Sequence, residues 1–248
     1  MDQTNAHGGW VDLHCHVLPG LDDGPAELAQ SVAVVQGLER LGFAELHPTP
    51  HQYAGRWTPN RAQCHAAAAA LRAALVAAGS KVVVADPAGE NMWDELLAAR
   101  HPTGAQPHYT GARAFLLEFP RDALPPQLAE RLFELRLHGS LPVIAHLERW
   151  PELADDPARL GSLAGKAALL VNLSALGGLG GWSTRGRARR LVLKQRVHAV
   201  TSDTHGESDL PFCKAGLEWL LRRLGPAGAR QLLVEGPRAI LAGEIPEA

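Results

Sequence analysis

Residues 11–24 read VDLHCHVLPGLDDG, a short apolar run that leads into two histidines and then into two aspartates. The run Trp10–Leu13 has the length and composition of a buried strand. His14 and His16 are two positions apart, so in an extended chain they point the same way and can reach one metal ion. This stretch therefore predicts a strand that delivers metal ligands at its carboxyl end.

The same arrangement recurs along the chain, where short apolar runs alternate with amphipathic segments. Further strands are predicted at 44–46, 81–85, 114–119, 141–145, 168–172 and 198–201. Helices are predicted at 26–41, 59–78, 125–138, 182–195, 211–224 and 236–242. Strands that alternate with helices predict an α/β protein with a parallel sheet and crossover helices. About seven such units predict a closed or nearly closed barrel, in a single domain over residues 1–248.

The composition limits the classes of protein to which the chain can belong. Hydrophobic residues make up 46% and charged residues 20%, which excludes an intrinsically disordered chain. The 24 basic and 26 acidic residues give a net charge of −2, so we expect no nucleic-acid partner. The three cysteines are scattered and predict no disulfide framework, which indicates a reducing compartment.

Two further sequence patterns bear on the cellular compartment and on membrane insertion. The longest apolar stretch, residues 66–78, contains Arg72 and is shorter than the roughly 20 apolar residues that span a bilayer. Residues 1–9 have neither the basic nor the apolar region of a signal peptide. We therefore expect a cytoplasmic protein without membrane insertion.

Histidines and carboxylates follow almost every predicted strand. The histidines and carboxylates at these strand ends are, in chain order, His14, His16, Asp22, Asp23, His47, His51, Glu90, Glu118, His146, Glu148, Asp203 and His205. The carboxyl ends of barrel strands meet at one end of the barrel, so we expect these side chains to gather there. Imidazole with carboxylate suits Zn, Mn or Fe, and a carboxylate such as Glu90 can bridge two ions. Closely spaced divalent ions serve phosphoryl and ester hydrolysis, with a metal-activated hydroxide as the nucleophile.

Each of these signals has a plainer explanation. A single His-x-His or Asp-x-His is more often structural or on the surface than a metal site. Glu118 is different, because a charge among apolar neighbours such as Leu117 and Phe119 needs a partner. Six such features at strand ends are not independent accidents, and together they favour a site.

Residues 12–24 resemble the opening motif of the PHP (polymerase and histidinol phosphatase) superfamily. The most similar branch is the bacterial capsule-type, manganese-dependent tyrosine-protein phosphatases. The order and spacing of further segments are similar to that branch: Thr49-Pro50-His51, Glu90, Leu117-Glu118-Phe119, 142–149 (PVIAHLER) and 202–205 (SDTH). The resemblance implies a distorted (β/α)7 barrel that hydrolyses phosphotyrosine on a protein. The implied substrate is the tail of a bacterial tyrosine kinase that controls capsule or exopolysaccharide synthesis.

The resemblance also implies three divalent metal ions, with Mn²⁺ the first choice and Fe or Zn as alternatives. One ion would take His14, His16, Glu90 and Asp203; a second would share Glu90 and add Glu118 and His146; a third would take Asp23, His51 and His205. Asp86 competes with Glu90, because the segment before Glu90 does not read as a regular strand.

Arginines are the candidates for holding phosphate. Arg149 lies just past His146, and its guanidinium offers the planar fork of donors that suits a phosphate, although it could also be an exposed loop cation. Members of the branch often carry an arginine after the Asp-x-His motif. Here Gly206–Asp209 follow, and the next cation is Lys214. Arg56, in a loop near His51, is a weaker candidate.

Three functions compete at this point. The first is the metal-dependent phosphotyrosine phosphatase. The second is a small-molecule phosphoesterase such as a histidinol-phosphate phosphatase. The third is a catalytically weak metal-binding regulator that docks on a kinase. A cysteine-dependent phosphatase is disfavoured, because no cysteine precedes a phosphate-binding loop, and Cys15 should pack away from the site.

Overall fold

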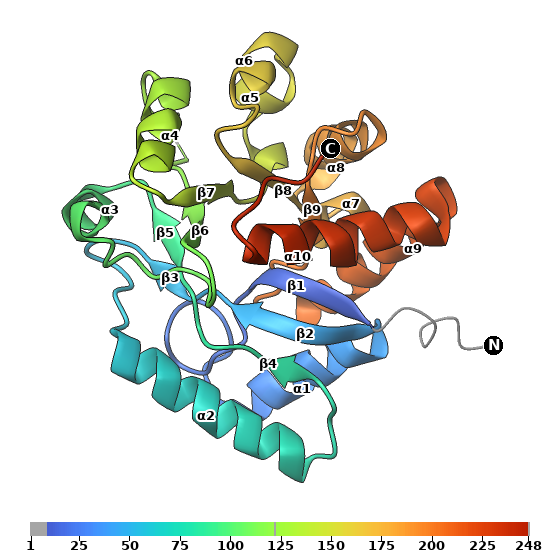
Figure 1. Ribbon diagram of the computed structural model, residues 1–248. Coiled ribbons are helices and arrows are strands. Elements are labelled where there is room, and N and C mark those ends of the chain that lie inside the picture. Colours follow the sequence, from blue (N-terminus) through green and yellow to red (C-terminus); the bar gives the residue numbers. More distant parts are fainter. Residues whose placement is uncertain (1–8, 122, 248) are drawn as a thin grey trace.

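The computed structural model describes residues 9–121 and 123–247. A parallel sheet curls about an axis, and most of the helices lie on its outside (Figure 1). The strands are β1 (Trp10–Cys15), β2 (Phe43–Pro48), β3 (His51–Gln52), β4 (Val83–Val84), β5 (Glu90–Met92), β6 (Ala114–Glu118), β7 (Leu141–Ile144), β8 (Ala168–Asn172) and β9 (Ala199–Thr201). This arrangement confirms the predicted parallel α/β barrel.

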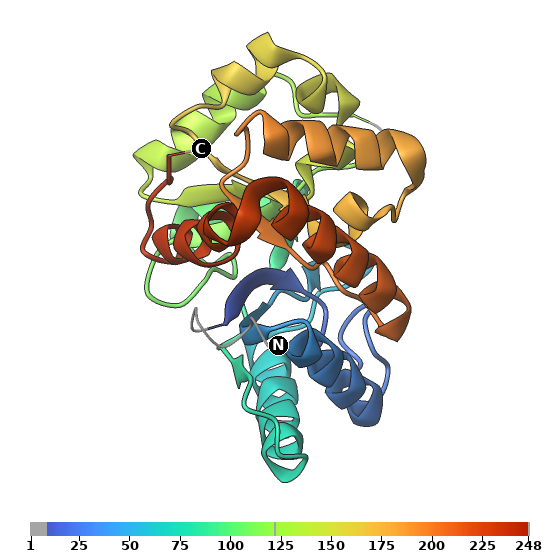
Figure 2. The ribbon, with the colours of Figure 1, turned by 90° about the vertical axis from the view of Figure 1, so that its right-hand side faces the viewer.

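Helices connect the strands and cover the outer face of the sheet. The α-helices are α1 (Leu28–Arg40), α2 (Arg61–Ala77), α3 (Glu95–Arg100), α4 (Leu128–Leu137), α5 (Pro151–Ala154), α6 (Pro157–Ser162), α7 (Leu173–Gly177), α8 (Gly181–Leu193), α9 (Leu210–Arg230) and α10 (Gly236–Leu241). In Figure 2, α9 and α10 (red) lie above β1, and α1 and α2 (blue to cyan) lie below it. Helix α10 contacts β1 directly.

Two positions of the barrel hold an interrupted strand. Thr49 and Pro50 separate β2, which ends at Pro48, from β3, since proline has no N–H to continue a ladder. A loop likewise separates β4 from β5, so the prediction of one strand over 81–85 is too long and misses β5. Parallel pairing runs β1–β2–β4 before these breaks and β3–β5–β6–β7–β8–β9 after them. Counting each interrupted pair once gives the seven strand positions of the predicted barrel.

The last strand position lies beside the first. The backbone N–H of Asp203, just past β9, donates to the His14 carbonyl at 2.8 Å. The backbone N–H of His16 donates to the Thr204 carbonyl at 3.0 Å, and a parallel bridge joins Cys15 to Thr204. The two ends of the sheet therefore meet where the candidate ligands lie.

Alternation along the strands builds two cores. In β6, Phe115 and Leu117 belong to the core between sheet and helices, whereas Leu116 faces the barrel interior with Val143 of β7. Ile240 of α10 packs against the interior core. Inward and outward faces alternate as expected for strands that are buried on both sides.

Several helix ends differ from the predictions by a few residues or more. Helix α2 begins two residues later than predicted, because Asn60 is the N-cap, and its side chain accepts the N–H of Gln63. Helix α9 continues past the predicted end at residue 224, with a kink at Gly225-Pro226, where Gly225 has φ 69°. Among the described residues, no helix is long and apolar enough to cross a membrane.

Candidate metal centre

All nine sequence-predicted ligands lie together at the carboxyl ends of the strands. They come from seven separate stretches: β1, the loop after it, β3, β5, β6, and the segments that follow β7 and β9. Eight of them form three overlapping groups of side-chain N and O atoms, which are His14, His16 and Asp203; His51, Glu90 and Glu118; and His16, Asp23, His51 and His205. The ninth, His146, adjoins the second group through Glu90. Distant parts of the chain thus converge on one small volume.

The first group centres on His14 Nε2. This atom lies 3.2 Å from His16 Nε2 and 3.2 Å from Asp203 Oδ1. It also lies 3.3 Å from Glu90 Oε2. A single ring N–H cannot satisfy three such neighbours, whereas a cation among them would suit every one. The donor set therefore fits a divalent metal that binds nitrogen and oxygen.

The second group is built around Glu90. Its Oε1 lies 2.9 Å from His146 Nε2, and its Oε2 lies 3.1 Å from His51 Nδ1. Glu118 is adjacent, with Oε1 3.4 Å from His146 Nε2. The two oxygens of Glu90 thus face different imidazoles, as a bridging carboxylate would.

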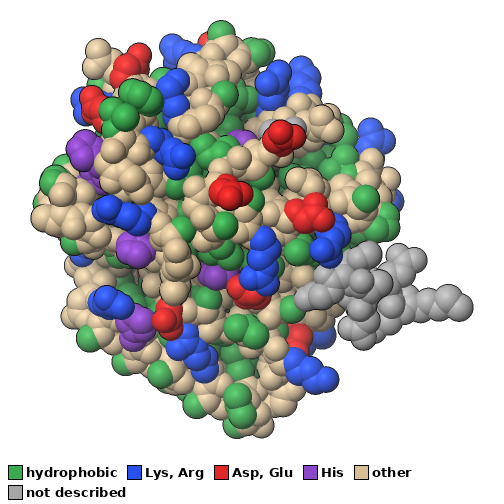
Figure 3. Space-filling model, in the orientation of Figure 1, with side chains coloured by type: hydrophobic (Ala, Val, Ile, Leu, Met, Phe, Trp, Pro, Cys, Tyr) green, Lys and Arg blue, Asp and Glu red, His purple; other side chains and the backbone are tan. Residues whose placement is uncertain are grey.

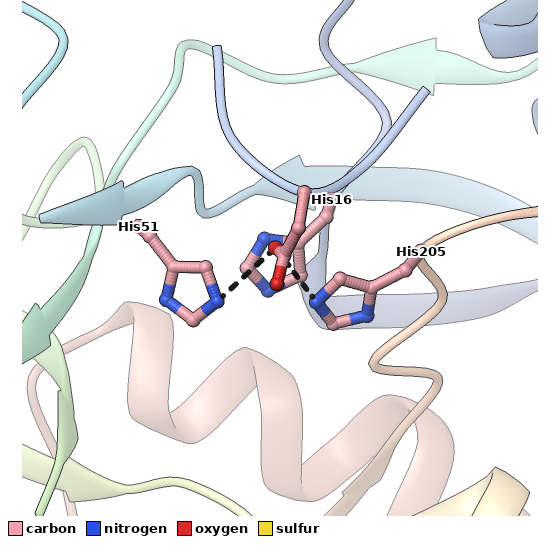
Figure 4. A group of neighbouring side chains, drawn as sticks. His16, His51 and His205 are labelled. Carbon is pink, nitrogen blue, oxygen red and sulfur yellow. Dashed lines mark ion pairs between the residues drawn. The ribbon is translucent and has the colours of Figure 1, made fainter. Parts of the chain in front are cut away.

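The third group is more open to solvent. Asp23 Oδ1 lies 3.4 Å from His51 Nε2 and 3.4 Å from His205 Nε2. Figure 4 shows the two rings on either side of this carboxylate, with dashed lines for both ion pairs. The ring of His16 stacks on that of His205 with centroids 4.0 Å apart, so this group adjoins the first.

Electrostatics also favour a bound cation. Burial, and then the charge of Glu90, raise the pKa of Glu118 to about 9. Burial, and then Arg149, lower the pKa of His146 to about 4, so its ring is neutral near pH 7 and able to bind metal. Burial opposes the charge of Asp203, but His14 and Arg149 hold its pKa below its ordinary value. A carboxylate cluster this crowded is relieved by divalent ions.

Backbone geometry at two of these residues is unusual. His146 has φ 32° and Asp203 has φ 51°, values in the left-handed region that residues other than glycine seldom adopt. Such conformations persist only where the surroundings enforce them, and they concentrate at functional sites. Here they turn both side chains back toward the cluster directly after a strand.

Three supporting residues were not among the ligands predicted from the sequence. Asp22 Oδ2 lies 2.7 Å from His16 Nδ1, and because a carboxylate only accepts, Nδ1 carries the hydrogen and Nε2 faces the cluster. Asn172, at the end of β8, donates to Asp203 Oδ2 at 2.5 Å. Asp12 accepts the Ser202 hydroxyl at 2.5 Å and ties β1 to β9. The Asp22-Asp23 doublet was a usable signal for Asp22, whereas nothing local marks Asn172.

The remaining candidates occupy different places. Arg149 donates to Asp203 Oδ2 at 2.7 Å, and its side chain is 38% exposed. Asp86 lies outside the three groups and pairs with Arg72 at 2.8 Å. Cys15 is buried in the core between sheet and helices, where burial raises the pKa of its thiol well above the usual range.

The chain is similar to curated proteins over nearly its whole length. A family model described as capsular polysaccharide synthesis, CpsB/CapC, matches residues 10–242. Tyrosine-protein phosphatase YwqE of Bacillus subtilis is 31% identical over 94% of this chain and 92% of its own length. Tyrosine-protein phosphatase CpsB of Streptococcus pneumoniae is 25% identical over 95% of this chain and 99% of its own length.

Solved structures give the same picture. One describes YwqE from Bacillus subtilis and CpsB from Streptococcus pneumoniae as metal-dependent tyrosine phosphatases; it aligns with a TM-score of 0.85 and 26% identity over 96% of this chain and 97% of that chain. An organophosphorus hydrolase from Deinococcus radiodurans aligns with a TM-score of 0.57 and 17% identity over 95% of this chain and 94% of that chain. At that identity the likeness concerns the fold alone.

Proposed function

The chain belongs to the CpsB/CapC family of capsular polysaccharide synthesis proteins, and we propose that it is a metal-dependent phosphatase that hydrolyses phosphotyrosine on a protein. The observation that carries this proposal is the convergence of nine His, Asp and Glu side chains at the carboxyl end of the barrel. The naming of the relatives as tyrosine-protein phosphatases supports the choice of substrate.

We extend the proposal to the substrate protein, the compartment and the metal ions that the family resemblance implies. The substrate would be a bacterial tyrosine kinase that controls capsule or exopolysaccharide synthesis, met in the cytoplasm. Three ions, with Mn²⁺ the first choice and Fe or Zn as alternatives, would be held by the eight residues of the three groups together with His146, within a single domain. When bound, such ions acidify a water and offset negative charge on the phosphate.

The protein's own groups would orient this chemistry. Asn172 and Arg149 both donate to Asp203 Oδ2, which leaves Oδ1 aimed at the cluster. Asp22 fixes the tautomer of His16 in the same way. The partly exposed guanidinium of Arg149 also has donors left over for an incoming phosphate.

The proposal is tested by comparing two substrates on the metal-loaded protein. We expect kcat/KM for a phosphotyrosine peptide to exceed that for histidinol phosphate. The reverse order would favour a small-molecule phosphoesterase. Turnover of neither substrate, with binding to a tyrosine kinase retained, would favour a regulator that docks without catalysis.

Arg149→Ala separates two roles of this side chain. If Arg149 binds the substrate phosphate, loss of a charge-assisted contact lowers kcat/KM by about ten- to a hundredfold while the metal content is unchanged. Arg149→Lys should recover only part of the loss, because an ammonium lacks the bidentate fork. The measurements are kcat/KM on a phosphotyrosine peptide and metal stoichiometry. A drop in metal content would show that Arg149 serves mainly to position Asp203, and wild-type turnover would remove it from the site altogether.

Cys15→Ser tests whether the thiol takes part. We expect most of the activity to remain, since Cys15 faces the core and the high pKa of its thiol disfavours a thiolate. The measurement is kcat on a phosphotyrosine peptide with the metal content checked in parallel. A loss beyond about a hundredfold with metals still bound would mean that the nucleophile is a thiolate.

A further inference from the structure

A tight turn at residues 53–57 stands at the rim of the metal centre. The backbone N–H groups of Arg56 and Trp57 donate to the Tyr53 carbonyl at 3.1 and 3.0 Å. Tyr53 N–H donates back to the Trp57 carbonyl at 2.7 Å, and Gly55 supplies the left-handed residue with φ 73°. These bonds make the turn a fixed structure rather than a loose loop.

The turn is anchored to the neighbouring helix. Asp94 Oδ2 accepts the N–H of Ala54 at 2.8 Å, while Asp94 Oδ1 caps α3 through the N–H of Leu96 at 2.9 Å. Both oxygens of this carboxylate are therefore engaged with the backbone. The turn is thus stabilised by its own backbone hydrogen bonds and by the hydrogen bond to Asp94.

An aromatic stack joins the turn to the metal centre. The Trp57 ring lies nearly parallel to the His51 ring, at 11° and with centroids 5.0 Å apart. The Arg56 guanidinium carbon lies 3.9 Å from the centre of the Trp57 ring, a cation–π contact. The guanidinium is therefore held within about 9 Å of a candidate metal ligand.

Arg56 is exposed and forms no ion pair with any carboxylate in the described ranges 9–121 and 123–247. The cation–π contact fixes the guanidinium but leaves its N–H donors unused. At the rim of the centre such a group is a preformed contact for an anion. Basic and acidic side chains are interspersed over the face drawn in Figure 3, and the 24 basic and 26 acidic residues of the chain nearly balance, so the protein has no overall positive charge that would draw anions to it.

When the phosphate of a phosphotyrosine lies at the metal centre, the peptide backbone of the substrate lies at the opening of that centre. The side chains on either side of it follow at about 3.3–3.6 Å per residue of extended chain. We propose that Arg56, held by Trp57, is a specificity residue that binds an acidic side chain next to the phosphotyrosine of the substrate. This inference rests on the proposed function and names the class of peptide that the site would prefer.

The test compares three substrates on the metal-loaded protein. They are a phosphotyrosine peptide with Asp or Glu on either side of the phosphotyrosine, the same peptide with Asn or Gln there, and p-nitrophenyl phosphate. The variants are Arg56→Ala and Arg56→Glu, with Arg196→Ala as the matched control. Arg196 is an exposed arginine that precedes β9 and so lies at the opposite end of the barrel.

We expect wild type to have the lower KM for the acidic peptide, with a preference that shrinks as salt is raised. Arg56→Ala should raise that KM roughly fivefold with little change in kcat or in metal content, as for a single exposed ion pair. Arg56→Glu should invert the preference. Turnover of p-nitrophenyl phosphate should not change, and Arg196→Ala should behave as wild type.

Other results would overturn the inference. An equal loss on all three substrates would mean that Arg56 serves the phosphate or the metals rather than the flanking residue. Unchanged KM values in Arg56→Glu, with wild type active, would overturn this inference alone. A wild-type protein inactive on all three substrates would overturn the proposed function, and this inference with it.

Discussion

Glu90→Gln should remove most of the bound metal and lower kcat/KM about a thousandfold. The Glu90 carboxylate lies within 3.3 Å of nitrogens on His14, His16, His51 and His146, so it is the shared anion of the cluster. Glutamine keeps the size but not the charge. Losing several kcal/mol of metal-dependent stabilisation corresponds to about three powers of ten in rate.

The measurement pairs kcat/KM on a phosphotyrosine peptide with metal content by atomic spectroscopy. Asp86→Asn is the matched control, because Asp86 was the competing candidate and its carboxylate pairs with Arg72 outside the cluster. We expect that variant to keep both its metal and its activity. If Asp86→Asn lost both while Glu90→Gln kept them, the bridging ligand would have been assigned to the wrong carboxylate.

Exhaustive chelation followed by dialysis should abolish phosphatase activity. Mn²⁺ should restore it better than Mg²⁺, because imidazole nitrogens suit transition metals and Mg²⁺ prefers an all-oxygen shell. Chelation should also lower the unfolding temperature by several degrees, since ions that bind only the folded state stabilise it and the apo cluster holds crowded carboxylates. Thermal melts with and without each metal give a readout that does not depend on turnover.

The outcome that contradicts this prediction is full activity in excess chelator after dialysis, with no metal detectable. Glu118 provides a further check on the physical reason. Its pKa of about 9 follows from burial and from the charge of Glu90, so the metal-free protein should take up a proton at this carboxyl that bound metal would displace. Metal binding near pH 7 should therefore release protons, which a weakly buffered titration would detect.

Sequence periodicity was sufficient for most of the fold. The runs that became β6, β7 and β8 are short and apolar, and their strict alternation assigns Leu116 and Leu170 to the interior and Leu117 to the outer core. The polar residue at each strand end was equally visible, because a charged group such as Glu118 stands out against apolar neighbours. Strand ends in a parallel barrel share one side, so the clustering of the nine candidates followed from topology.

Other parts depend on contacts that no local pattern encodes. The strand that carries Glu90 is three residues long and exists because it pairs with β3 on one side and β6 on the other. Asn172 holds Asp203 across 31 positions of sequence, so its role appears only in the folded chain. The sequence placed Arg56 in a loop near His51, but the contact of Arg56 with Trp57 and the stacking of Trp57 on His51 appear only in the folded chain.

The meeting of β9 with β1 has a consequence for how the protein is made. His14 leaves the ribosome early, yet Asp203 and His205 are synthesised nearly two hundred residues later, and the backbone bonds from Asp203 to His14 form only then. Until that moment β1 pairs with β2 on one edge, and its other edge is unpaired. The incomplete metal centre also lacks ligands in two of its three groups. Ions that need the full set can be captured only by a nearly finished chain, so uptake of metal would mark the completion of the nascent protein.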